Sequence, residues 1–102
     1  MLTGLRVMFK QNAQLGRFNV DFLVRDLVIE CYGDFWHCNP AIWPADRYNR
    51  SLHMTAGEKW AKDGRRRTAL EEKGYRFCAF WESEIRDDPD SVRTALRELL
   101  GR

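Results

Sequence analysis

Two strand-like runs separated by only two residues constrain the fold of this chain most strongly. Phe18–Val24 and Leu27–Tyr32 are rich in the β-branched and aromatic residues that favour strands. If residues 25 and 26 form a hairpin turn, residues that pair across the two strands have numbers that sum to 51. This register predicts that Asp21 lies directly opposite Glu30.

The predicted pair of carboxylates indicates a metal site. Two acidic side chains that face each other across a sheet repel and destabilise it, and a divalent cation between them removes that cost. Magnesium prefers oxygen ligands and needs only one or two carboxylates, because waters and phosphate oxygens complete its shell. We therefore predict that Asp21, Glu30 and the backbone carbonyl of Cys31 bind Mg²⁺, for which Mn²⁺ can substitute. Without metal, we expect the uncompensated pair to lower stability.

Length and composition fit a small protein with one core. The 102 residues, 44% of them apolar, suit a single domain spanning residues 1–102. No run of about 20 apolar residues and no charged-then-apolar leader occurs. We therefore expect no membrane partner and a cytoplasmic location, in a bacterium or a phage-infected host. The three cysteines lack paired spacing, which argues against a disulfide framework, and Cys31 and Cys78 are expected to be buried core thiols.

Positive charge gathers in one segment although the net charge is only +2. Between residues 59 and 67, five cations are offset only by Asp63; they are Lys59, Lys62, Arg65, Arg66 and Arg67. Such a run suits a polyanion. A solvated helix face is the alternative explanation.

Together with the two strands already described, the apolar and turn patterns in the rest of the chain predict the element order β-β-β-loop-α-β-α. A first strand is expected at residues 5–10 and a last one at residues 75–81, with a long irregular segment at residues 38–55. Together these predict an α+β fold in which helices flank a small mixed sheet. The acidic pair would lie at one edge of that sheet, near the basic helix.

Two helices have clear start signals. Thr55 and Glu58 form a capping-box pattern before a helix that should end at Lys73. Asp88 and Pro89 suit the start of a final helix. The apolar face of that helix would consist of Val92, Leu96, Leu99 and Leu100.

The Gly-Asp-Phe-Trp-His cluster at residues 33–37 supplies a candidate base. Histidine titrates near neutral pH, so His37 can deprotonate an attacking water beside a metal that stabilises the leaving group. Phe35, Trp36 and Trp60 can wedge between bases or stack on them. These residues point to phosphodiester hydrolysis; a structural role for His37 and core packing for the aromatics are the alternatives.

Residues 19–24, 28–37, 60–63 and 74–82 together resemble the very-short-patch repair (Vsr) endonucleases. They resemble the EDxHD homing endonucleases more closely, and both groups belong to the PD-(D/E)XK nuclease superfamily. The similarity covers about residues 17–86, and its most specific part is Phe-Trp-His after a glycine. It implies a PD-(D/E)XK core and a magnesium-dependent endonuclease that nicks or cuts double-stranded DNA, in association with a mobile element.

The resemblance also implies roles for particular residues. Asp21 matches the metal-binding aspartate, and Cys31 matches the residue whose carbonyl also binds metal. His37 matches the catalytic histidine, and Asp63 matches the aspartate that orients it.

Further positions match the aromatic and acidic residues of the family. Phe35, Trp36 and Trp60 match aromatics that intercalate beside the target. Glu30 matches the acid of ordinary superfamily members, and Tyr32 stands where those members have lysine.

The chain departs from this pattern in two ways that affect function. No acidic residue precedes Asp21, so the core lacks the N-terminal helix and its catalytic glutamate. A homodimer partner or a separate N-terminal fragment would then be needed for full activity. Ser83 and Cys38 replace most of the family's zinc ligands, so no structural zinc is expected.

Two other functions compete with the nuclease prediction. A non-catalytic or partner-dependent DNA-binding module derived from a nuclease fold would keep the basic and aromatic contacts. An RNA-directed nuclease or toxin component would use the same metal chemistry.

Overall fold

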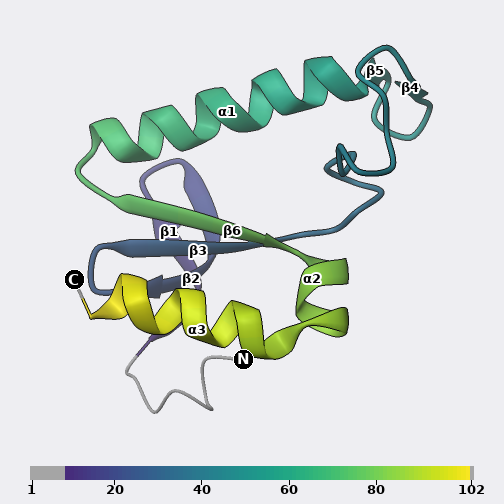
Figure 1. Ribbon diagram of the computed structural model, residues 1–102. Coiled ribbons are helices and arrows are strands. Elements are labelled where there is room, and N and C mark those ends of the chain that lie inside the picture. Colours follow the sequence, from purple (N-terminus) through teal and green to yellow (C-terminus); the bar gives the residue numbers. More distant parts are fainter. Residues whose placement is uncertain (1–8, 102) are drawn as a thin grey trace.

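The computed structural model describes residues 9–101 and shows a mixed sheet with helices on both faces (Figure 1). The sheet contains β1 (Lys10–Leu15), β2 (Phe18–Val24), β3 (Leu27–Tyr32) and β6 (Arg76–Trp81), in the order β1-β2-β3-β6. β3 and β6 are parallel, and the other neighbours are antiparallel. Helix α1 (Ala56–Glu72) lies along one face, with α2 (Glu82–Asp87) and α3 (Pro89–Leu100) toward the other. The predicted α+β fold, a small mixed sheet flanked by helices, is confirmed.

The β2–β3 hairpin has the predicted register but not the predicted pairing at its acidic end. The turn falls at residues 25 and 26, and regular pairing runs from Val24–Leu27 to Phe22–Ile29. It stops there, so Asp21 and Glu30 are not directly paired in the sheet. Nor do they lie at a sheet edge, because β1 pairs with the outer side of β2. The polar sequence of β1 hides this strand from pattern analysis.

The two predicted helix starts are confirmed. The Thr55 hydroxyl accepts a hydrogen bond from the backbone N–H of Glu58, whose carboxylate accepts one from the Thr55 N–H. Helix α1 ends at Glu72 before Gly74, whose φ of +96° suits a residue without a side chain. Asp88 caps α3, and Pro89 is its first residue.

Three elements differ from the sequence-based expectations. The first strand occupies Lys10–Leu15, and most of the predicted range 5–10 lies outside the described residues. The long loop contains a short ribbon of β4 (Tyr48–Asn49) and β5 (Met54–Thr55). Helix α2 was not predicted, because six residues with one aliphatic side chain, Ile85, give no periodicity.

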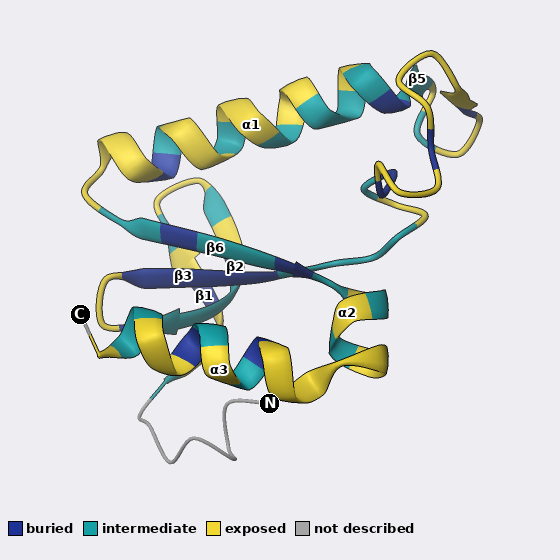
Figure 2. Ribbon diagram, viewed as in Figure 1, coloured by how far each residue is buried: buried dark blue, intermediate teal, exposed yellow. Residues whose placement is uncertain are grey.

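Two apolar clusters lie on opposite faces of the sheet. Figure 2 shows buried residues in the strands and in the helices on both sides of them. The cluster under α3 consists of Val24, Leu27, Ile29, Phe80, Val92 and Leu96. The cluster under α1 consists of Ala13, Val20, Val28, Leu70 and Phe77. Cys31 and Cys78 are only half-buried, contrary to prediction, and Cys38 is the fully buried thiol, packed with Trp43 in the loop. No helix within residues 9–101 is long and apolar enough to cross a membrane.

Candidate active site

Asp21 and Glu30 meet at the point where regular pairing between β2 and β3 ends. Each carboxylate replaces a backbone contact: the Asp21 N–H donates to Glu30 Oε2 at 3.2 Å, and the Cys31 N–H donates to Asp21 Oδ2 at 2.8 Å. Both side chains line one cavity of about 300 Å³ together with His37 and Asp63. The structure thus brings the four predicted catalytic residues to one place.

Arg66 of α1 neutralises part of the acidic charge. Its guanidinium donates to Glu30 Oε1 and, at 2.6 Å, to the carbonyl of Asn19. Glu30 is only 5% exposed, and this burial raises the pKa of its carboxyl, an effect that Arg66 opposes without cancelling it. The expectation of an uncompensated pair is therefore wrong, because Arg66 supplies a counter-charge from a different element.

His37 is held by two side chains, Asp63 and Tyr32. Its Nδ1 lies 2.9 Å from Asp63 Oδ2, and its ring stacks on Tyr32 with centroids 4.2 Å apart. Lys59 Nζ contacts the other Asp63 oxygen at 2.8 Å. Burial acts to raise the pKa of Asp63, but hydrogen bonds from His37 and Lys59 outweigh it and lower the pKa. An ionised carboxylate only accepts hydrogen bonds, so this contact places a proton on Nδ1 and favours the tautomer in which Nε2 is the acceptor.

The loop that carries His37 is tied to α2 by hydrogen bonds. Asp34 Oδ1 accepts from Asn39 Nδ2 at 2.8 Å and from Ser83 Oγ at 2.9 Å. The Asp34 N–H donates to Glu82 Oε1 at 3.1 Å, and the His37 N–H donates to the Gly33 carbonyl. Sequence reasoning treated Ser83 only as a lost zinc ligand and missed this contact.

The three predicted DNA-contacting aromatics fall into two groups. Phe35 and Trp36 are 45% and 56% exposed and pack edge to face, so they can meet a ligand. Trp60 is half-buried, and its indole N–H donates to the Cys38 carbonyl at 2.6 Å. Trp60 therefore anchors the loop to α1, in addition to any contact it makes with DNA.

The five predicted basic residues also divide by environment. Lys59 and Arg66 are engaged with Asp63 and Glu30, and Arg67 lies over the Phe77 ring. Lys62 and Arg65 are exposed. A cavity of about 480 Å³ adds Arg17, which sequence reasoning did not place in the site, although it belongs to the acid-free segment before Asp21. The residues lining this basic groove are Arg17, Phe18, Lys59, Lys62, Asp63, Arg65 and Arg66.

The acidic cavity fits a hard divalent cation on one condition. Of the three carboxylates that line it, Asp63 is engaged with His37 and Lys59, which leaves Asp21 and Glu30; magnesium needs one or two when water and phosphate supply the rest. Within residues 9–101, no group of three acidic, histidine or cysteine side chains is arranged to hold a metal. Binding by Asp21 and Glu30 therefore requires that Arg66 release Glu30.

Comparison with known proteins establishes the fold. No family model and no curated protein matches the chain. Among solved structures, the catalytic domain of homing endonuclease I-Bth0305I is similar, with a TM-score of 0.64 and 22% sequence identity. The similarity covers 95% of this chain and 82% of that one. The chain thus has the nuclease-like fold of a homing endonuclease catalytic domain.

Proposed function

We propose that this protein is a metal-dependent DNA endonuclease of the homing type, related to the Vsr and EDxHD enzymes. One observation carries the proposal: Asp21, Glu30 and the His37–Asp63 pair line a single cavity beside a basic groove. The fold shared with a homing endonuclease catalytic domain supports it. Double-stranded DNA in the cytoplasm of a bacterium or phage-infected host is the proposed substrate.

Each residue has a distinct task in the proposed reaction. Asp21, Glu30 and the Cys31 carbonyl would hold Mg²⁺ or Mn²⁺, which would stabilise charge on the phosphate oxygens. His37 Nε2 accepts a proton from the water whose oxygen bonds to phosphorus as the bond to the leaving oxygen breaks. Asp63 holds the imidazole in the required tautomer.

Arg66 links DNA binding to this site. Its guanidinium pairs with Glu30 in the protein alone, but a DNA phosphate in the basic groove offers an alternative partner. Moving Arg66 to that phosphate would free Glu30 for the cation. A second copy of the chain, or a separate N-terminal fragment, remains the proposed source of a further catalytic acid.

A plasmid-nicking assay with magnesium tests the proposal. Asp21→Asn keeps the shape of the side chain but removes its charge, so nicking should fall by about a hundredfold or more. Asp46→Asn is the matched control, because Asp46 is an exposed loop carboxylate that lines neither the acidic cavity nor the basic groove. Equal and measurable nicking rates for Asp21→Asn and the unmodified chain would refute the nuclease assignment.

The contact between Arg66 and Glu30 also favours a second candidate, a non-catalytic DNA-binding module. If Arg66 holds Glu30 permanently, the acidic cavity binds no cation and the basic groove still binds DNA. DNA affinity would then be the same in EDTA as in magnesium, would fall steeply with salt, and would not change in His37→Ala. Nicking by the purified chain excludes this candidate.

A further inference from the structure

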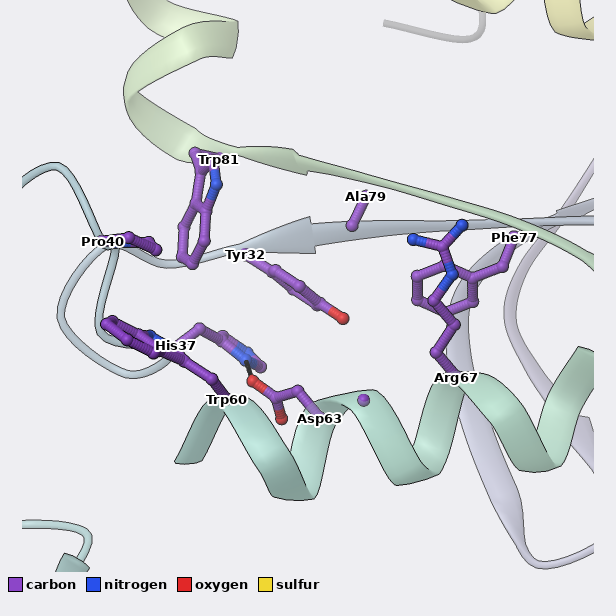
Figure 3. A pocket seen from close by; sticks show the side chains of 10 residues that line it. Tyr32, His37, Pro40, Trp60, Asp63, Arg67, Phe77, Ala79 and Trp81 are labelled. Carbon is purple, nitrogen blue, oxygen red and sulfur yellow. Dashed lines mark hydrogen bonds and ion pairs between the residues drawn. The ribbon is translucent and has the colours of Figure 1, made fainter. Parts of the chain in front are cut away.

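A third cavity, mainly aromatic, also borders the His37–Asp63 pair (Figure 3). It measures about 260 Å³ and opens between α1 and the strand pair β3–β6. The Tyr32 and Trp81 rings pack edge to face, and Arg67 lies over the Phe77 ring with its guanidinium carbon 5.1 Å from the centroid. The Tyr32 side chain lines the pocket, and its phenolic hydroxyl can donate a hydrogen bond. The pocket therefore combines flat apolar walls with hydrogen-bond donors.

Gly64 keeps the α1 side of this pocket open. A glycine inside a helix costs about 1 kcal/mol relative to alanine, so its presence needs a reason. The backbone supplies none, because Gly64 is not among the described residues with positive φ. Packing supplies none either, because a Cβ added at Gly64 would have no atom within 4 Å. Gly64 is exposed and lines the pocket, so the absence of a side chain there leaves the pocket wider on its α1 side.

Three cavities adjoin one another around residues 59–67 of α1, and Asp63 lines all of them. The basic groove and the acidic cavity share Lys59, Asp63 and Arg66. The acidic cavity and the aromatic pocket share Tyr32, His37 and Asp63. Cationic, acidic and aromatic surfaces thus follow one another in the order that would meet backbone phosphates, the phosphate to be cleaved, and a base attached next to it.

We propose that the aromatic pocket binds one unstacked nucleobase adjacent to the phosphate in the acidic cavity. This inference rests on the proposed function, because the base is adjacent to the cleaved phosphate only if that phosphate lies beside Asp21 and Glu30. A single planar ring system suits a pocket smaller than the roughly 300–1,000 Å³ typical of drug-sized ligands. The base stacks on the rings, and Arg67 and the Tyr32 hydroxyl are available to its polar edge. The enzyme therefore acts on DNA that is locally distorted.

Nuclear magnetic resonance titration with deoxyadenosine monophosphate tests the pocket without requiring cleavage. The nucleotide should shift the ring resonances of Tyr32, Phe77 and Trp81, whereas deoxyribose phosphate, which lacks the base, should not. Gly64→Leu should weaken nucleotide binding about tenfold, the loss of one stacked base. Leucine is a better helix former than glycine, so the melting temperature of this variant should not fall. Ala61→Leu, on the exposed surface of the same helix, is the control and should bind like the unmodified chain.

The outcomes separate this inference from the nuclease proposal. Equal ring shifts with both ligands, no ring shift up to the solubility limit, or unchanged binding by Gly64→Leu would each overturn the base pocket. If those results occur while Asp21-dependent nicking is observed, the nuclease proposal stands without the pocket. Base-dependent shifts that Gly64→Leu weakens support the pocket, and the same shifts in a chain that never nicks DNA would overturn only the nuclease proposal.

Discussion

The two faces of the sheet differ in how they use their helices. On the α3 face, Val92 and Leu96 are buried against strand residues in a continuous apolar cluster. On the α1 face, only Ala56 and Leu70 of the 17 helical residues are buried, and cavities adjoin the rest of the helix. The α3 face therefore has the more continuous apolar packing, whereas α1 packs on the sheet mainly through Leu70 and leaves cavities beside residues 59–67.

The faces differ in buried charge as well. All buried side chains of the α3 cluster are apolar, but the α1 face holds the buried carboxylate of Glu30. Burial of a charge lowers stability unless a partner compensates it, and Arg66 compensates Glu30 only in part. The α1 face thus retains an arrangement that lowers stability, as expected of a functional surface.

Removing apolar volume from the α3 face should have the largest effect on folding. Leu96→Ala should lower the free energy of unfolding by about 2–5 kcal/mol, because Leu96 is fully buried. Leu99→Ala, a half-buried site on the same helix, should cost less. Chemical denaturation measures both, and a larger loss for Leu99→Ala would contradict the described packing. Below its unfolding transition, Leu96→Ala should nick DNA within about threefold of the unmodified rate.

Removing the counter-ion on the α1 face should have the next largest effect. Arg66→Gln leaves Glu30 buried without its cation, so unfolding in EDTA should become easier by roughly 1–3 kcal/mol. Magnesium or manganese should restore more stability to this variant than to the unmodified chain, because Arg66 no longer competes for Glu30. Arg65→Gln, at an exposed neighbour, is the control. Equal melting temperatures for the two variants in EDTA would show that Arg66 does not compensate Glu30.

Removing one hydrogen bond from the loop at residues 33–39 should have a smaller effect on stability. Ser83→Ala removes one hydrogen bond to Asp34 and should lower the free energy of unfolding by about 0.5–1.5 kcal/mol. Amide hydrogen exchange at residues 33–39 should accelerate, because this contact ties the loop to α2. Ser91→Ala, at an exposed position in α3, should leave that exchange unchanged. Unaltered exchange in Ser83→Ala would mean that other contacts hold the loop.

Neutralising Glu30 should have the smallest effect on the free energy of unfolding, and should raise this free energy rather than lower it. The folded-state pKa of Glu30 is raised above its ordinary value of 4.5. Its contribution to stability is therefore fully present below pH 4.5 and is lost as the pH rises through the folded pKa. Without metal, Glu30→Gln should raise the free energy of unfolding at neutral pH by about 1 kcal/mol or less.

Measurements across pH isolate the Glu30 effect. The stability difference between Glu30→Gln and the unmodified chain should vanish near pH 4.5 and grow toward neutral pH. DNA nicking should be lost in the same variant. A melting temperature that falls at neutral pH in EDTA would show that Arg66 stabilises the charged carboxyl more than burial penalises it.

Local signals made the fold largely predictable. The two-residue turn at residues 25 and 26, the Thr55 capping box and the Asp88-Pro89 start are each encoded by adjacent residues. The position of strand β1 and the presence of helix α2 were not predicted, because a polar edge strand and a six-residue helix carry no hydrophobic period. Their existence depends on partners that are distant in sequence.

The site was predictable only in part for the same physical reason. Asp21, Glu30, His37 and Asp63 were identified from strand register and family resemblance, and the structure brings them together. The pairing of Arg66 with Glu30 depends on how α1 crosses the sheet, which no local pattern specifies. The same holds for the space in front of Gly64, which sequence analysis left without a function.

The position of a bound cation tests the central claim most directly. In crystals of the protein grown with manganese and DNA, the anomalous signal should lie within about 2.5 Å of both an Asp21 and a Glu30 carboxylate oxygen. Arg66 should then have moved from Glu30 to a phosphate. Manganese bound elsewhere, with Arg66 still paired to Glu30 and DNA in the basic groove, would contradict the account.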